Sequence, residues 1–224
     1  ALPIVAQGFQ LSKQEFVDAL TIRYGFPLKR VPSKCACGSS FSIEHALHCP
    51  TGGYISMRHN NLRDTFANMM RDVVKDVNTE PMLTPLTGEK FSRKTTSTDR
   101  EACADISWKG FWSPGVTTFI DVTVLNPLAP SYRHKSMQIL LRNAENEKKN
   151  KYAERIIQVE KGTFTPLVFS TLGVCGVEAS CFIKRLIELH SMKTKSDQSK
   201  LACLIRTKIS FSIVNLQSCV YLSF

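Results

Sequence analysis

Residues 117–125 read Thr-Thr-Phe-Ile-Asp-Val-Thr-Val-Leu, and aromatic, β-branched and other apolar side chains fill most of these positions. A run of this kind predicts an inner strand of a sheet that is covered on both faces. Asp121 lies in its middle. A lone buried carboxylate is costly unless a cation or a hydrogen-bond donor lies close by. The stretch therefore predicts the centre of a sheet and a place where charged groups gather.

The flanking segments predict how this sheet is built. Residues 102–108 form a second strand, which carries Asp105 and is joined to the first through a hairpin at 110–115. Hairpin pairing would bring Asp105 and Asp121 to one end of the sheet. A helix over 136–159, followed by an apolar strand at 164–171, predicts parallel pairing with a right-handed crossover. Glu80, at the start of an earlier extended segment, is a candidate third acid.

The crossover helix predicts the cation that these acids need. Lys148, Lys151 and Arg155 stand at i, i+3 and i+7 on one helix face. Neighbouring carboxylates form an oxygen-rich site for Mg²⁺, and a lysine beside it can orient an attacking water. Each feature also has a plain explanation, as a salt-bridged acid in a strand or a solvated helix face. In combination they predict a metal-dependent phosphodiesterase.

A dense group of cysteines and histidines precedes these elements. Cys35, Cys37, His45 and Cys49 lie in a stretch rich in glycine and serine that is too short to bury a core of its own. Residues 1–9 lack a secretion-signal pattern, so the group favours a metal over disulfides. Three thiolates and one imidazole would complete a structural zinc site, with His48 as an alternative to Cys49.

Basic residues outnumber acidic ones, 29 to 19, and the formal net charge is +10. This balance favours a polyanionic partner, because contacts to phosphates release counterions. No run approaches the roughly eighteen apolar residues of a membrane helix. A helix predicted over 57–77 opens with two basic residues, for which phosphate contact and a plain solvated helix start are both open interpretations. The residues predicted to bind nucleic acid are Arg58, His59, Arg63 and Arg155, and a basic path could continue through Lys29, Arg30, Lys34, Arg133, His134 and Lys135.

Several short motifs resemble those of a known family. In chain order, after the Cys/Cys/His/Cys cluster, they are Arg58-His59-Asn60, Thr79-Glu80-Pro81, Ala104-Asp105-Ile106, Ile120-Asp121-Val122 and Lys148-Lys149-Asn150-Lys151-Tyr152. Together they look like the restriction-like endonuclease at the carboxyl end of site-specific non-long-terminal-repeat retrotransposon proteins. The match covers about residues 35–155.

The resemblance implies an α/β fold, in which a restriction-endonuclease-like mixed sheet of the PD-(D/E)xK type is flanked by helices and preceded by a small zinc-binding module. It also implies that Asp105 and Asp121 bind Mg²⁺, that Glu80 assists, and that Lys148 or Lys151 is the catalytic lysine. Such an enzyme would nick target DNA in the nucleus. Element RNA would be a further partner, and a reverse transcriptase domain would be fused to the nuclease.

Two departures from the family pattern keep a second function open. Ala104 stands where the family usually has proline, and Thr123 where a lysine is usual after the second acid. The alternative is a catalytically inactive, zinc-stabilised nucleic-acid-binding module. The expected organisation is an N-terminal helix at 1–30, a zinc knuckle at 31–56, a nuclease core at 57–192 and a C-terminal extension of undetermined structure at 193–224. We expect the natural chain to extend further upstream, because helical patterning starts at Leu11 without an initiator methionine.

Overall fold

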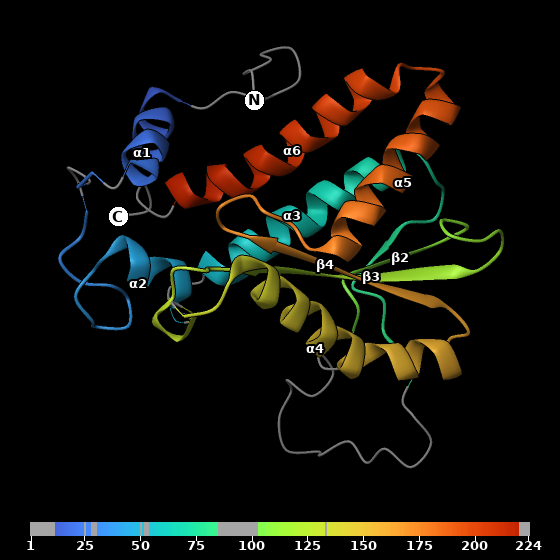
Figure 1. Cartoon of the computed structure of the whole chain (residues 1–224), viewed down its shortest axis with the longest axis horizontal. Coiled ribbons are helices and arrows are strands. Elements are labelled where there is room, and N and C mark those ends of the chain that lie inside the picture. Colours follow the sequence, from blue (N-terminus) through green and yellow to red (C-terminus); the bar gives the residue numbers. More distant parts are fainter. Residues whose placement is uncertain are drawn as a thin grey trace.

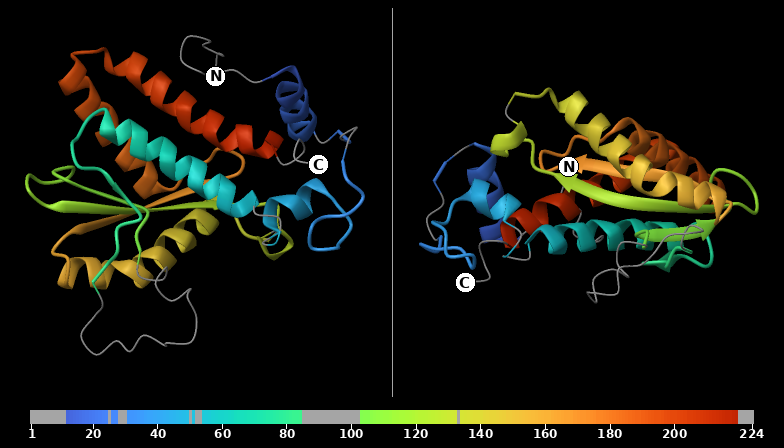
Figure 2. Two further views of the ribbon diagram at one scale, coloured as in Figure 1. Left: turned by 180° about the vertical axis from the view of Figure 1, so that it is seen from behind. Right: turned by 90° about the horizontal axis from the view of Figure 1, so that it is seen from below.

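The computed structural model describes residues 12–24, 26–27, 31–49, 51, 54–84, 103–132 and 134–219. Within them, a four-stranded sheet in the order β1-β2-β3-β4 lies between two layers of helices (Figure 1). Helix α4 covers one face, and α3, α5 and α6 lie over the other (Figure 2). The predicted mixed α/β class is confirmed.

The sheet combines antiparallel and parallel pairing. β1 (Asn78–Thr79), β2 (Ile106–Lys109) and β3 (Thr117–Leu125) are antiparallel neighbours, and the Gly110 N–H donates to the Val116 carbonyl to close the hairpin between β2 and β3. β4 (Thr163–Ser170) runs parallel to β3, and α4 (Met137–Gln158) connects them after the short 3-10 turn η3 (Pro130–Tyr132). The predicted hairpin and crossover are therefore confirmed, although β2 is shorter than expected.

The main hydrophobic core lies between the sheet and the helices α3 (Tyr54–Arg71), α5 (Val177–Thr194) and α6 (Gln198–Cys219). Several aromatic rings pack within it, and those of Phe111 and Phe182 stack with their centroids 4.5 Å apart. A smaller set of apolar side chains, including Tyr152 and Ile156 of α4, packs on the opposite face. Both faces of β3 are therefore covered, as its sequence predicts.

Helix α6 forms part of this main core. Leu201, Ile205, Ile209 and Ile213 are buried in the same cluster as the inner side chains of α3 and α5. Because these four residues repeat every fourth position, they form one stripe along the helix. Residues 198–219, part of the segment whose structure the sequence left undetermined, are thus helical and pack on the main core rather than standing apart.

Helix α1 (Lys13–Arg23) starts with a capping box. The Ser12 N–H donates to Glu15 Oε2 at 2.6 Å, and the Glu15 N–H donates to Ser12 Oγ at 3.2 Å. Its neighbour in the fold is α6. Across the described residues, every helix is too short or too polar to cross a membrane.

Candidate functional site

A tight turn brings Cys35 and Cys37 together. The Cys35 N–H donates to the Ser39 carbonyl at 2.9 Å, and the Gly38 N–H donates to the Cys35 carbonyl at 2.8 Å. Gly38 has a φ of +85°, a conformation that glycine adopts without a steric penalty. The single residue between the two cysteines is therefore accommodated by a turn at Gly38.

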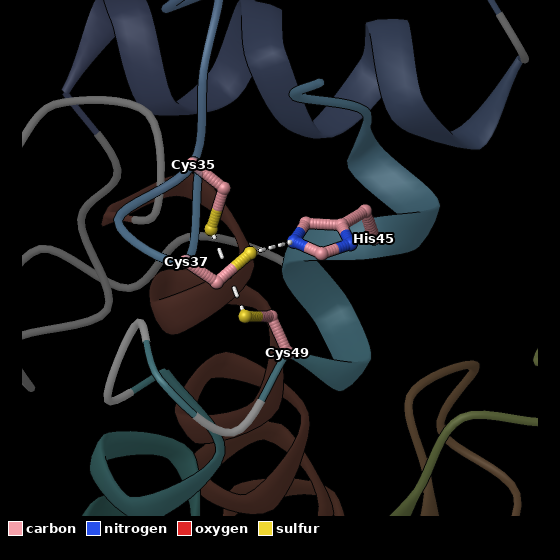
Figure 3. A group of neighbouring side chains, drawn as sticks. All are labelled: Cys35, Cys37, His45 and Cys49. Atoms are coloured by element: carbon pink, nitrogen blue, oxygen red, sulfur yellow. Dashed lines mark hydrogen bonds between the residues drawn. The ribbon is translucent and has the colours of Figure 1, made fainter. Parts of the chain in front are cut away.

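Helix α2 (Ile43–His48) supplies the other two candidate ligands. Ser42 caps its start, where the side-chain oxygen accepts from the His45 N–H at 3.0 Å. At its end, the Cys49 N–H donates to the His45 carbonyl at 2.8 Å. His45 and Cys49 are four positions apart and so lie on one side of this helical turn, facing the two cysteines of the preceding turn (Figure 3).

The four side chains form a cluster that fits a structural zinc ion. Their ligand atoms all lie within 4.8 Å of one another. The sulfurs of Cys35 and Cys49 are 3.7 Å apart, close to the separation of about 3.8 Å between two thiolates of a tetrahedral zinc centre. Hydrogen bonds from the side chain and backbone of Ser39 lower the pKa of Cys37 to about 6, which favours the metal-binding thiolate. This cluster could bind a metal such as zinc; the side chain of the alternative ligand, His48, lies outside the described residues.

A second group of charged side chains surrounds the two predicted acids. Ile106 of β2 lies opposite Ile120 of β3, so Asp105 and Asp121 each adjoin this pair in the sequence. The Asp105 N–H donates to the Ile120 carbonyl at 3.0 Å, which continues the pairing past the end of β2. The two carboxylates therefore come from adjacent positions of neighbouring strands.

Asp121 is buried beside a lysine of α4. Its side chain is 5% exposed, and Lys148 Nζ lies 2.8 Å from its Oδ2. Burial raises the pKa of Asp121, and the negative charge of Asp105 raises it further, while Lys148 opposes both effects. The hydroxyl of Thr123 also donates to Asp121 Oδ2, at 3.3 Å. A cation at this place would relieve the repulsion between the two carboxylates.

Asp105 is held from two sides. Its Oδ2 accepts from the Val122 N–H at 2.5 Å, and its Oδ1 lies 3.0 Å from His59 Nε2. Burial lowers the pKa of His59, but the hydrogen bond and the negative charge of Asp105 outweigh this effect and raise the pKa overall. The carboxylate is thus fixed in orientation before any ligand binds.

Glu80 lies next to this acidic site but faces a different partner. Its backbone N–H donates to the Asp105 carbonyl at 2.8 Å, whereas its side chain is 66% exposed and forms an ion pair with Arg63. Burial lowers the pKa of Arg63, but its hydrogen bond and ion pair with Asp64 outweigh this effect, and the charges of Glu80 and Asp105 raise the pKa further. Glu80 therefore borders the acid pair through its backbone and through Arg63.

His59 and Arg63 are the residues whose role the sequence did not indicate. They were expected to contact nucleic acid, but they stand four positions apart on one face of α3 and meet Asp105 and Glu80. The i, i+4 spacing shows that they share a helix face. That this face points at the acids depends on how α3 packs on the sheet.

The structure separates the two candidate lysines and corrects the expected surface position of two arginines. Lys151 is exposed, with Nζ 5.0 Å from the centre of the Tyr152 ring, whereas Lys148 forms an ion pair with Asp121. Arg58 is 4% exposed and Arg155 is 8% exposed. Both lie on inward faces of their helices, so neither presents its guanidinium on the surface as phosphate binding would require.

Of the proposed basic path, Lys34, His134 and Lys135 are exposed, and Lys29, Arg30 and Arg133 lie outside the described residues.

In comparisons with known proteins, no protein-family model and no curated protein matches this chain. The conclusions about its chemistry therefore depend on the two clusters themselves: a cysteine–histidine cluster that could bind a metal such as zinc, and an acidic site that joins Asp105, Asp121, Lys148 and His59.

Proposed function

We propose that this chain is a Mg²⁺-dependent endodeoxyribonuclease with a restriction-endonuclease-like core and a structural zinc module. The observation that carries the proposal is the convergence of Asp105, Asp121 and Lys148 on one place at the end of a hairpin. Two carboxylates and one ammonium are the set that metal-assisted hydrolysis of a phosphodiester requires. The resemblance of the short motifs supports the same conclusion.

Asp105 and Asp121 would hold the divalent ion, since each carboxylate has lone pairs left after its contacts with the protein. When bound, such an ion would make a bound water more acidic and would neutralise charge on the phosphate. Lys148, delivered from α4, would orient the attacking water and offset the charge that develops on the phosphate oxygens. It would take the place of the lysine that the family usually carries at the position of Thr123.

His59 would keep Asp105 oriented, and Arg63 would compensate the charge of Glu80 at the border of the site. The geometry supports a pair of carboxylates as the metal ligands, because the side chain of Glu80 is mostly exposed and paired with Arg63. Glu80 would assist only if it changed its partner on DNA binding. By the same resemblance, we propose DNA as the substrate, element RNA as a further partner, a fused reverse transcriptase domain and a nuclear location.

Plasmid nicking tests this proposal. Zinc-loaded protein is incubated with supercoiled plasmid with and without Mg²⁺, and the open circle is quantified over time. We expect Mg²⁺-dependent nicking that falls at least about a hundredfold in Asp121→Asn and Lys148→Met. Lys184→Met, a matched change at an exposed lysine of α5, should nick like the wild type.

The second candidate function is an inactive, zinc-stabilised nucleic-acid-binding module. The exposed side chain of Glu80, together with Ala104 and Thr123, favours it, because each departs from a complete nuclease site. DNA binding without nicking at any Mg²⁺ concentration would support this module and contradict the nuclease.

A further inference from the structure

Arg58 of α3 is buried where a positive charge needs partners. Its side chain is 4% exposed, and burial lowers its pKa. Nη1 and Nη2 each lie 3.4 Å from the Leu47 carbonyl oxygen, and Nη2 lies 3.5 Å from that of Val124. Nε has no hydrogen-bond partner among the described residues. An apolar side chain of similar size would fill this place at a lower cost in free energy. Packing alone therefore does not explain an arginine here.

One partner of Arg58 belongs to the strand of the acidic site. Val122 and Val124 have the same parity along β3, so their backbone groups point to the same edge. β2 pairs with this edge only from Thr117 to Ile120. Beyond that point, Asp105 accepts from the Val122 N–H and Arg58 donates to the Val124 carbonyl. These two side chains continue the hydrogen bonding of the β3 edge where β2 has ended.

The other partner of Arg58 belongs to the cysteine–histidine cluster. Leu47 lies in the last turn of α2, between the candidate ligands His45 and Cys49. Carbonyls in a last helical turn lack intrahelical partners and carry partial negative charge. The guanidinium of Arg58 satisfies one of them. A single side chain thus joins the ligand-bearing end of α2 to β3, three residues beyond Asp121.

We infer that Arg58 is a positioning residue that couples the cysteine–histidine cluster to the acidic site. With zinc on its four ligands, the end of α2 is fixed, and Arg58 holds the edge of β3 against it. Without the metal, the Leu47 carbonyl is free to move, Arg58 loses a fixed anchor, and the β3 edge beside Asp121 loosens. The effect on cleavage rests on the proposed function, whereas the coupling between the two sites does not.

Hydrogen exchange of the full chain, followed by mass spectrometry, tests the coupling. Peptides that cover 119–126 are compared in zinc-loaded protein and after removal of zinc by a chelator. In the wild type, we expect zinc removal to speed exchange in this segment about tenfold or more, because β3 opens locally without its anchor. In Arg58→Met, exchange should already be fast with zinc bound, and zinc removal should add little. Arg142→Met, at an exposed position of α4, should behave like the wild type.

Two results would overturn the inference. One is an unchanged exchange rate over residues 119–126 when the wild type loses zinc. The other is a rise in exchange rate on zinc removal that is as large in Arg58→Met as in the wild type. Should Arg58→Met fail to fold, the comparison of the wild type with and without zinc still tests the coupling. Arg58→Lys keeps the charge, so its exchange rate should lie between those of the wild type and Arg58→Met. Because exchange is measured without substrate, a protein that shows the coupling but does not nick DNA would refute the nuclease and leave the role of Arg58 intact.

Discussion

Replacing Lys148 with methionine removes the cation from a buried ion pair and leaves Asp121 uncompensated. The two charged atoms lie 2.8 Å apart, so their attraction is about 6 kcal/mol at an effective dielectric constant of about 20. Desolvation of both groups offsets much of this energy. Since the Lys148 side chain is 26% exposed, we expect Lys148→Met to lower the free energy of unfolding by about 2–3 kcal/mol at neutral pH. This is below the range for breaking a fully buried pair.

The dependence on pH follows from the raised pKa of Asp121. Between the ordinary pKa of an aspartate and this raised value, the folded protein binds more protons than the unfolded chain, so stability falls as pH rises. Removing Lys148 raises the pKa of Asp121 further. The cost of Lys148→Met should therefore shrink as pH falls through the raised pKa, because a neutral Asp121 no longer needs the ammonium.

Urea unfolding of a double-mutant cycle measures this coupling. In the Asp121→Asn background, Lys148→Met should cost less than about 1 kcal/mol, because the charge it compensated is gone. Lys151→Met, a matched change at an exposed lysine of the same helix, should cost less than about 0.5 kcal/mol in either background. An equal cost of Lys148→Met with and without the Asp121 charge would refute the reasoning.

Three further changes test the fold and the second contact of the acid pair. In Gly162→Ala, the new Cβ would lie 2.7 Å from the Thr117 carbonyl oxygen, so we expect urea unfolding to show a loss of about 1–3 kcal/mol; wild-type stability would contradict this close contact. Ile205→Ala should cost about 2–4 kcal/mol in a single cooperative transition, whereas a negligible cost would mean that α6 is separable from the core. The pKa of His59 is raised, so its protonated form stabilises the fold through Asp105. This stabilisation is fully present below the ordinary histidine pKa and is lost above the raised pKa. The difference in thermal stability between wild type and His59→Gln should therefore shrink as pH rises from below the ordinary histidine pKa to above the raised pKa, and a constant difference would count against the ion pair.

The sequence predicted the part of the site that lies along one continuous stretch of chain. The apolar run around Asp121 indicates an inner strand, the hairpin brings Asp105 close to it, and the crossover brings α4 with Lys148 over the same sheet face. The period of the helix could not choose between Lys148 and Lys151, because both lie on one stripe. Which of the two lysines contacts the acid depends on how α4 packs over β3, and in the structure it is Lys148 that contacts Asp121.

The contributions of α3 could not be predicted from local patterns. Arg58, His59 and Arg63 open a helix as basic residues of a surface would, and no periodicity tells which of them faces a buried carboxylate. Tertiary packing turns His59 and Arg63 toward the acids and buries Arg58 under β3. The four residues of the cysteine–histidine cluster were accessible to sequence reasoning, because residue type and spacing alone indicate metal chemistry.

Direct measurement of divalent-cation binding tests most closely whether Asp105 and Asp121 share one ion. Zinc-loaded protein is titrated with Mn²⁺, a spectroscopically visible substitute for Mg²⁺, and the bound ion is counted by electron paramagnetic resonance. We predict one Mn²⁺ per chain in the wild type and in Lys184→Met, and at least about a tenfold loss of affinity in both Asp105→Asn and Asp121→Asn. Mn²⁺ binding of wild-type strength in either aspartate variant would contradict the shared site.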